Sequence, residues 1–278
     1  VILKLKVADE QAAASTETAV EDSETEAAEE APAESPASTP TAPAPTAATF
    51  DGNSDLHAEV VVLGSGPGGY TAAFRAADLG KKVVLIEKYD NIGGVCLNVG
   101  CIPSKALLHT AEIINEAAER ADHGIEFGKP MIDIKKLAAF KNSVINQLTG
   151  GLAQLAKKRD VQIVTGYGKF TSANTIAVEG KDGSTTISFD NAIIAAGSSV
   201  FKIPDFPYDD ERLMDSTGAL ELADIPKRLL VIGGGIIGLE MATVYDALGS
   251  NVSVVELSPS LIPGCDSDLV RPLMKRVR

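Results

Sequence analysis

Cys96 and Cys101 stand five residues apart in the sequence GGVCLNVGCIPSK, which covers residues 93–105. In an unbroken helix, Cα atoms at this spacing lie roughly 8–9 Å apart, whereas a disulfide needs about 4.4–6.8 Å. The two cysteines can therefore join only where the backbone between them is distorted at the start of a helix. We expect Asn98 and Gly100, which tolerate unusual dihedral angles, to permit that distortion. The spacing thus indicates a redox-active dithiol.

Two other interpretations of these cysteines stay open, namely a buried pair without chemistry and one half of a zinc site. The chain has one further cysteine, Cys265, and three histidines, none of them at a spacing that would complete a metal site. We therefore predict no metal. Three cysteines in 278 residues also exclude a secreted scaffold that is held together by disulfides.

Lys105 follows Cys101 by one helical turn, so both side chains can face the same ligand. A cation at that place, together with a helix N-terminus, would lower the pKa of a thiol and stabilise its thiolate. Pro103 and Ser104 are typical of a helix start. The alternative is that Lys105 is a solvated surface lysine.

The elements before the cysteines are typical of a dinucleotide-binding unit. A buried strand at residues 60–63 precedes the glycine-rich sequence 64–69, and a helix over residues 70–79 follows. In this motif the glycines allow a tight turn, a close approach of the backbone to a pyrophosphate, and close packing of helix and strand. Glu87 ends the next strand 18 residues after Gly69, where an acid that binds ribose is expected.

A second copy of this pattern follows a predicted strand at residues 228–232. It has the sequence GGGIIG at residues 233–238 and an acid, Glu256, at the end of the strand 252–256. A carboxylate there accepts hydrogen bonds from ribose hydroxyls and repels a 2′-phosphate, so the site should prefer NAD(H) to NADP(H). A tight turn without a ligand is the alternative. Two nucleotide sites and one dithiol imply a relay of hydride and electron pairs through a flavin.

The remaining pattern and the composition predict an α/β fold with two Rossmann-like dinucleotide-binding domains. Helices are expected at residues 106–120 and 134–158, and strands within 161–170, 174–178 and 185–195. No apolar run approaches the ~20 residues that span a bilayer. The net charge of −13 includes −8 from residues 1–50, and no basic stripe indicates nucleic-acid binding.

The predicted organisation has four parts. Residues 1–7 form a strand-like remnant, and residues 8–54 form a disordered acidic linker rich in Ala and Pro, which is extended by its prolines and charges. The first nucleotide-binding domain covers residues 55–200, and an incomplete second one covers 201–278. Because the sequence opens on Val and stops inside that second unit, we expect it to be truncated at both ends.

Taken together, residues 93–105, 64–69 and 235–240 resemble the flavoprotein disulfide oxidoreductase family, and most closely its members that oxidise dihydrolipoamide. The resemblance implies that the first domain binds FAD and the second binds NAD. It also implies that Cys96 exchanges with the substrate and that Cys101 faces the flavin. Lys105 would lie against the flavin and pair with Glu240.

The resemblance extends to a set of cofactor contacts. The family places a glycine such as Gly168 near FAD, and a turn that matches Ala195-Ala196-Gly197 except for a missing threonine. The FAD contacts so implied are Gly64, Ser65, Gly66, Pro67, Gly68, Gly69, Glu87, Lys88, Gly93, Gly94, Cys96, Lys105, Gly168, Ala196, Gly197 and Ser198. The NAD contacts are Gly233, Gly234, Gly235, Ile236, Ile237, Gly238 and Glu256.

The resemblance further implies a homodimer that serves the lipoyl domains of 2-oxoacid dehydrogenase complexes. The small number of cysteines and the soluble composition suit the cytoplasm. The family's acid/base pair of histidine and glutamate would follow Arg278, so this chain alone is expected to have little turnover. Residues 1–7 resemble the last strand of a lipoyl domain. Two alternatives are an NADPH-dependent disulfide or mercuric reductase of the same family, and a non-catalytic flavin-binding scaffold.

Overall fold

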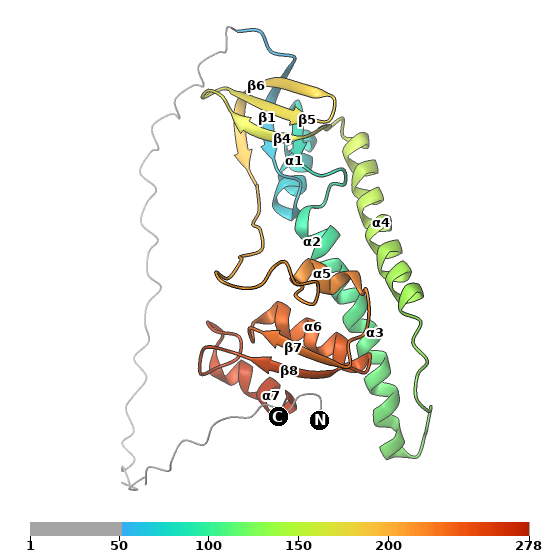
Figure 1. The fold of residues 1–278 in the computed structure, drawn as a ribbon. Helices are drawn as coiled ribbons and strands as arrows, with labels where there is room; N and C mark the ends of the chain where they lie inside the picture. Colours follow the sequence, from blue (N-terminus) through green and yellow to red (C-terminus); the bar gives the residue numbers. More distant parts are fainter. Residues whose placement is uncertain (1–51, 278) are drawn as a thin grey trace, which may run out of the picture. The chain divides into compact units, whose positions relative to one another are not determined.

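The computed structural model describes residues 52–277, which form two sheets with their helices (Figure 1). The larger sheet has the strand order β3-β2-β1-β6-β5-β4, and the smaller one pairs β7 with β8. The predicted α/β fold is confirmed. The predictions for residues 1–7 and for most of the linker at 8–54 lie outside the described residues.

The larger sheet is parallel on one side and antiparallel on the other. β1, β2, β3 and β6 run parallel, while β4 and β5 continue from β6 as an antiparallel meander. The strands are β1 (Leu56–Leu63), β2 (Val83–Glu87), β3 (Gln162–Thr165), β4 (Tyr167–Phe170), β5 (Thr175–Gly180) and β6 (Gly183–Ile194). The single strand-rich stretch predicted at 161–170 is two strands, because Gly166 has φ +157° and turns the chain between them.

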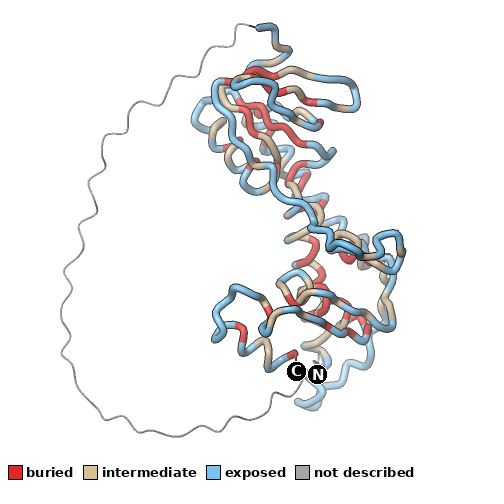
Figure 2. Tube along the Cα trace, turned by 60° about the vertical axis from the view of Figure 1, so that its left-hand side comes forward, coloured by how far each residue is buried: buried red, intermediate tan, exposed pale blue. Residues whose placement is uncertain are grey.

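The central strands are buried on both faces, which explains their continuous apolar sequences. On one face, Val61 and Val84 pack with Ile187 of the meander. On the other face, Val62 and Leu85 pack with residues of α1 (Pro67–Asp78) and with the end of α4. Figure 2 shows this buried core along the strands. Packing on both faces of β1 holds the end of this strand, and with it the start of the first glycine-rich turn, in place.

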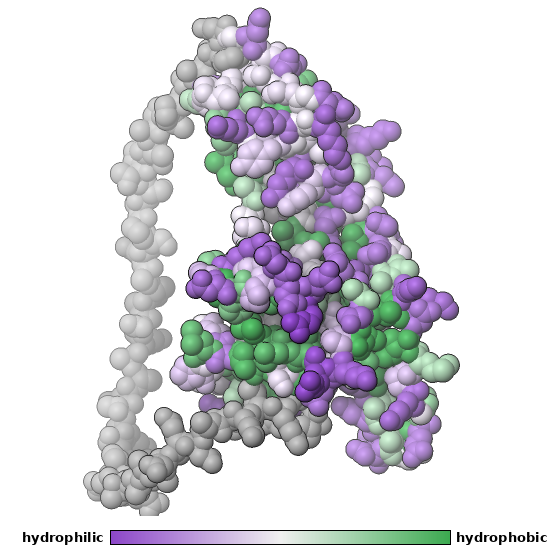
Figure 3. All heavy atoms as spheres, viewed as in Figure 1, coloured by the Kyte–Doolittle hydropathy of each residue, from purple (hydrophilic) through white to green (hydrophobic). Residues whose placement is uncertain are grey.

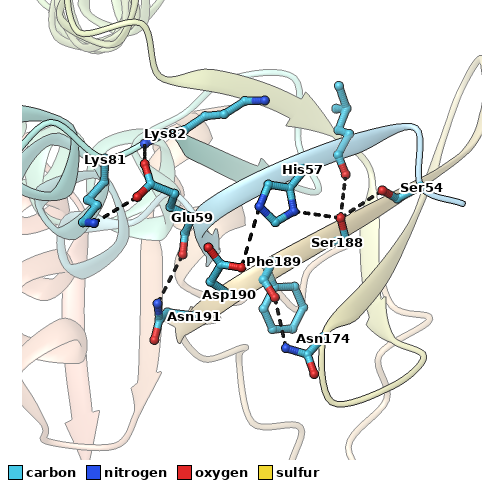
Figure 4. A network of polar contacts seen from close by, with 11 residues as sticks. Ser54, His57, Glu59, Lys81, Lys82, Asn174, Ser188, Phe189, Asp190 and Asn191 are labelled. Atoms are coloured by element: carbon cyan, nitrogen blue, oxygen red, sulfur yellow. Dashed lines mark hydrogen bonds and ion pairs between the residues drawn. The ribbon is translucent and has the colours of Figure 1, made fainter. Parts of the chain in front are cut away.

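The start of β1 is tied to β6 by polar side chains (Figure 4). The buried hydroxyl of Ser188 lies 2.9 Å from the Ser54 hydroxyl and 3.0 Å from Nδ1 of His57. His57 also lies 3.7 Å from a carboxylate oxygen of Asp190. These contacts join the start of β1 to its central neighbour β6 and give His57 a structural role.

The helices between and after the strands carry the cysteines and the second unit. Their bounds are α2 (Gly94–Val99), α3 (Cys101–Glu119), the 3-10 helix η1 (Arg120–His123), α4 (Ile134–Lys158), α5 (Ser216–Glu221), α6 (Ile236–Ala247) and α7 (Ser267–Val277). The helix predicted to start at Ala106 begins at Cys101 instead, so Pro103 and Ser104 lie in its first turn, where the Ser104 hydroxyl donates to the Cys101 carbonyl at 3.2 Å. No helix within residues 52–277 is long and apolar enough to cross a membrane.

The second unit consists of β7 (Arg228–Ile232), α6 and β8 (Asn251–Val255), with the two strands parallel. One face of this sheet packs into a core with α5, α6, α7 and Leu107 of α3. The opposite face is open, because Leu230, Ile232 and Val255 are about half exposed. Hydrophobic side chains accordingly gather over β7 and β8 in Figure 3.

Candidate dinucleotide and dithiol sites

The first glycine-rich turn connects β1 to α1 with no room for side chains at two positions. Gly64 has φ +99°, and a Cβ there would overlap the carbonyl oxygen of Ala195. A Cβ on Gly69 would overlap the carbonyl oxygen of Gly64. The N-cap Gly66 provides no side chain to bond the first turn of α1, so the N–H groups of that turn are left to bind an anion. The turn therefore fits a pyrophosphate.

Glu87 is buried beside this turn and accepts three hydrogen bonds. Its Oε2 accepts from the backbone N–H of Ser65 at 3.0 Å and from the Ser65 hydroxyl at 2.5 Å, and Oε1 accepts from the N–H of Tyr89 at 3.0 Å. A carboxylate has about four acceptor positions, so one is left for a ribose hydroxyl. The ammonium of Lys88 lies 4.7 Å from the centre of the Tyr89 ring.

Two further predicted contacts lie close to this turn. The Ala195 N–H donates to the Leu63 carbonyl at 2.8 Å, so the exposed residues 196–198 follow directly where β1 enters the turn. Gly168 lies in β4, and a Cβ there would come within 2.8 Å of Leu63 Cδ1. Packing of β4 against β1 is thus a sufficient reason for a glycine at 168. Contact of these residues with a cofactor stays a prediction.

The second turn repeats the backbone geometry of the first. Gly233 has φ +107°, and a Cβ on Gly238 would overlap the carbonyl oxygen of Gly233. Helix α6 begins at Ile236 after the N-cap Gly235, again without a side-chain cap. The side chains of Ile236 and Ile237 are about 60% exposed. This turn likewise has free N–H groups for a pyrophosphate.

Glu256 holds the place of Glu87 in this second copy, but it is only half-buried. Its Oε2 accepts from the Gly234 N–H at 2.7 Å, and Oε1 accepts from the N–H and the hydroxyl of Ser258 at 2.8 and 2.7 Å. Hydrogen bonds from Ser258 and Gly234 lower the pKa of Glu256 to about 2. The carboxylate is therefore ionised at neutral pH, as recognition of ribose hydroxyls requires.

The two cysteines lie on either side of a break between α2 and α3. Gly100, with φ −145° and ψ −115°, separates the two helices, as the spacing predicted. Asn98 does not contribute to the break, which corrects that expectation. It stays in α2 and donates from its side chain to the Gly94 carbonyl at 2.9 Å. Cys96 and Cys101 are free thiols in this structure, so their disulfide stays a prediction.

Burial and hydrogen bonding with Cys101 raise the pKa of Cys96 to about 11. The nearby Lys105 acts in the expected direction and lowers the pKa of Cys96, but its effect is smaller than that of burial. Lys105 Nζ donates to Glu240 Oε1 at 2.5 Å, so the ion pair that the resemblance implied is present. This pair joins α3, which begins at Cys101, to α6 of the second unit, and Glu240 raises the pKa of Lys105.

Sequence reasoning missed the part that Ser65 plays in joining these elements. Its hydroxyl contacts both the acid of the first copy and the backbone before α2. A comparison of the two turns contains the signal, because serine stands at 65 where the second copy has Gly234. Among residues 52–277, no cluster of three His, Cys, Asp or Glu side chains forms that would hold a metal ion.

The chain matches known proteins over most of the described residues. The sequence model of the pyridine nucleotide-disulphide oxidoreductase family matches residues 58–278. Dihydrolipoyl dehydrogenase of Vibrio cholerae serotype O1 is 58% identical over 226 residues, which are 81% of this chain and 48% of that protein. The mitochondrial dihydrolipoyl dehydrogenase 1 of Arabidopsis thaliana is 46% identical over 213 residues, which are 76% and 42% of the two chains.

The structure is similar to that of the HOCl-induced flavoprotein disulfide reductase RclA from Escherichia coli. The TM-score is 0.67 at 27% identity, and the match covers 79% of this chain and 47% of that one. The chain spans about half the length of the curated relatives it matches. By the family match and these identities, the chain belongs to the pyridine nucleotide-disulphide oxidoreductase family.

Proposed function

We propose that the protein acts as an NAD-dependent dihydrolipoyl dehydrogenase, which oxidises dihydrolipoamide through a Cys96–Cys101 disulfide. One observation carries this proposal. The two cysteines lie on either side of a helix break beside a dinucleotide turn, and Lys105 pairs with Glu240 one helical turn after Cys101. The names of the relatives support dihydrolipoamide as the substrate.

The proposed thiol–disulfide exchange involves only the two cysteines and the two thiols of the substrate. A substrate thiolate attacks the sulfur of Cys96, the S–S bond breaks, and Cys101 leaves as a thiolate. The second substrate thiol then displaces Cys96, so the substrate becomes a disulfide and the cysteines become a dithiol. Two electrons and two protons pass from substrate to protein. The roles of the two sulfurs rest on the family resemblance.

Lys105 would hold the thiolate in this scheme. Its pKa is raised by Glu240, so its ammonium stays charged at neutral pH. A cation one turn along α3 would stabilise the negative charge that leaves on the Cys101 sulfur when the disulfide opens. Glu240, whose side chain is 20% exposed, would keep that ammonium oriented. We assign the acid/base role of the reaction to no described residue.

The two glycine-rich turns fit two dinucleotides, which we propose to be FAD at residues 64–69 and NAD at residues 233–238. Both turns exclude a Cβ, and both acids keep an acceptor position for a ribose. When bound, FAD would accept the electron pair of the dithiol and pass it to NAD as a hydride. The domain limits of 55–200 and 201–278 belong to this proposal.

The second acid favours NAD over the alternative of an NADPH-dependent reductase. Glu256 is ionised and half-buried, so a 2′-phosphate beside it would meet a negative charge. Comparing NADH with NADPH as the reductant of the full-length protein tests this point. A preference for NADPH would favour a disulfide or mercuric reductase instead.

The proposal also includes partners and location. The relatives' activity implies lipoyl domains of 2-oxoacid dehydrogenase complexes as the source of substrate, and the family resemblance implies a second copy of the chain. We place the protein in the cytoplasm, because three cysteines in 278 residues suit a reducing compartment.

Single cysteine substitutions test the central claim. In the full-length protein with FAD, Cys96→Ala or Cys101→Ala should abolish NAD reduction by dihydrolipoamide, since neither variant can form the disulfide. Cys265→Ala is the matched control, because that exposed thiol lies outside the site. Full activity in either of the first two variants would disprove the proposal. A flavin spectrum without a long-wavelength shoulder after two-electron reduction would favour the scaffold alternative.

A further inference from the structure

The side chain of Ser65 joins the first glycine-rich turn to the cysteine segment. The residue is fully buried, and its hydroxyl donates to Glu87 Oε2 at 2.5 Å. The same hydroxyl oxygen accepts from the backbone N–H of Gly93 at 3.2 Å. That N–H also reaches the carbonyl oxygen of Ser65 at 2.9 Å. One serine therefore binds the acid of β2 and the residue that starts α2.

Gly93 matters because it is the N-cap of the helix that carries Cys96. Gly93 and Gly94 have φ of +110° and +60°, and a Cβ on Gly94 would lie 2.6 Å from the Cα of Gly66. The start of α2 thus lies directly against the turn, where it is held by the two bonds to Ser65. Cys96 follows in the first turn of this helix.

Cys101 is held in a different way. It begins α3, whose residues Leu107 and Ala111 are buried and which packs against α6. Gly100 breaks the backbone between the two helices. The two cysteines therefore lie on two helices that also pack against each other but have different further anchors, the first glycine-rich turn for the start of α2 and α6 for α3. The distance between the two sulfurs depends in part on how firmly the start of α2 is fixed.

The second copy shows that the acid does not need a hydroxyl from the turn. Gly234 stands in the place of Ser65, and the acid there takes its hydroxyl bond from Ser258 instead. The backbone N–H bond from turn to acid is present in both copies. A hydroxyl in the turn occurs only in the copy that precedes the cysteines.

We propose that Ser65 is a positioning residue for the dithiol. Its hydroxyl fixes the start of α2 against the first turn and so raises the effective concentration of one thiol toward the other. This inference rests on the proposed function, because it requires that Cys96 and Cys101 cycle between dithiol and disulfide.

Equilibrium with dithiothreitol measures this effect without any turnover. Cys96 and Cys101 lose two S–H bonds and gain one S–S bond, while oxidised dithiothreitol loses its S–S bond and takes up the two electrons and two protons. The full-length protein is equilibrated with reduced and oxidised dithiothreitol and then alkylated. Mass spectrometry gives the fraction of disulfide, and hence the equilibrium constant.

We expect Ser65→Ala and Ser65→Gly each to lower this equilibrium constant about three- to tenfold. This range takes the free energy of the neutral hydrogen bond between the Ser65 hydroxyl and the Gly93 N–H as the upper limit of the effect. The glycine variant copies the second turn, so its backbone is compatible with the fold. Ser258→Ala is the matched control, since it also removes a serine hydroxyl from a nucleotide-site acid, and it should leave the constant unchanged. The wild-type protein is measured both with and without FAD, so that each variant can be compared with a wild-type sample of the same FAD content.

The outcomes separate this inference from the proposed function. Constants equal to the matched wild type in both Ser65 variants would overturn the role of Ser65, whatever their FAD content. A drop of equal size in Ser258→Ala would also overturn it, because the effect would not be specific to the first turn. A wild-type pair that never forms a disulfide would instead refute the proposed function.

Discussion

The two glycine-rich turns have the same backbone geometry but different surroundings. In the first copy the acid, Glu87, is buried and takes a hydroxyl bond from the turn itself. In the second copy the acid, Glu256, is half-buried and takes a hydroxyl bond from Ser258, two residues further along. The first acid is thus part of the internal structure, while the second acid is more open to a ligand.

The sheets around the turns differ in the same sense. Both faces of β1 and β2 are covered, by the meander on one side and by helices on the other. The β7–β8 sheet is covered on one face, and Leu230 and Ile232 on the other are about half exposed. The repeated motif therefore lies in a sheet that is covered on both faces in the first copy, and in a sheet with one half-exposed face among the described residues of the second.

The largest effect should come from Gly69→Ala. Its methyl group would overlap the Gly64 carbonyl, so the variant should lose about 3 kcal/mol of the free energy of unfolding and should fail to retain FAD. Gly150→Ala is the control, because a Cβ there has no neighbour within 4 Å and the residue lies in α4, outside the proposed FAD contacts. Urea unfolding and the flavin spectrum measure both results. Equal stability of the two variants would contradict the close packing of helix and strand.

Replacing Glu87 and Glu256 should have different effects, on stability in the first copy and on NAD binding in the second. Glu87→Ala leaves the buried Ser65 N–H without a partner and should cost about 1–3 kcal/mol of stability, measured by urea unfolding. Glu256→Ala should instead raise the KM for NAD about tenfold to a hundredfold, because hydrogen bonds to a charged acceptor are lost. If Glu87→Ala costs no stability, or Glu256→Ala leaves the KM unchanged, the contrast between the copies is wrong.

Lys105→Met tests the ion pair with Glu240 that joins α3 to α6, and it should have a small effect on stability. The lysine side chain is 61% exposed, so loss of its pair with Glu240 should change the free energy of unfolding by less than about 1 kcal/mol. Turnover should fall nonetheless, because the cation beside the thiols is lost. Lys181→Met, which removes an exposed pair with Asp90 elsewhere, is the control and should keep full turnover.

The smallest effect concerns the pH dependence of the second acid. The pKa of Glu256 is lowered from its ordinary value of 4.5 to about 2 in the folded chain. Its stabilising contribution is therefore complete above about pH 5 and is lost as the pH falls toward 2. The difference in urea midpoint between wild type and Glu256→Gln should shrink from pH 6 to pH 3. A difference that grows at low pH would have the wrong sign.

The sequence predicted most elements because their periods and glycines are local signals. The helix at 134–158 and the strand at 228–232 are confirmed with the predicted bounds. The start of α3 was predicted five residues too late, because the helical periodicity is evident only from Ala106. Pro103 and Ser104 do lie in the first turn of α3, as expected of residues at a helix start. The strand break at Gly166 was also missed, since it depends on pairing with two different neighbours.

The sequence predicted the residues of the candidate site, but not the hydrogen bonds and ion pairs that join them. The Lys105–Glu240 pair came from resemblance, since nothing local relates two residues that stand 135 positions apart. The bond from Ser65 to Gly93 was not foreseen, because a serine in a glycine-rich turn has many possible partners. Only the folded chain selects one of them.

By itself, the sequence determined two strand–glycine–helix units, their acids and a cysteine pair that needs a distorted backbone. These are matters of spacing along one chain, which helix and strand geometry translate directly. The tertiary structure decided which acid is buried, which hydroxyl each acid receives, and which turn holds the start of α2. Burial and hydrogen-bond partners depend on packing between distant segments, and packing is settled only when the layers come together.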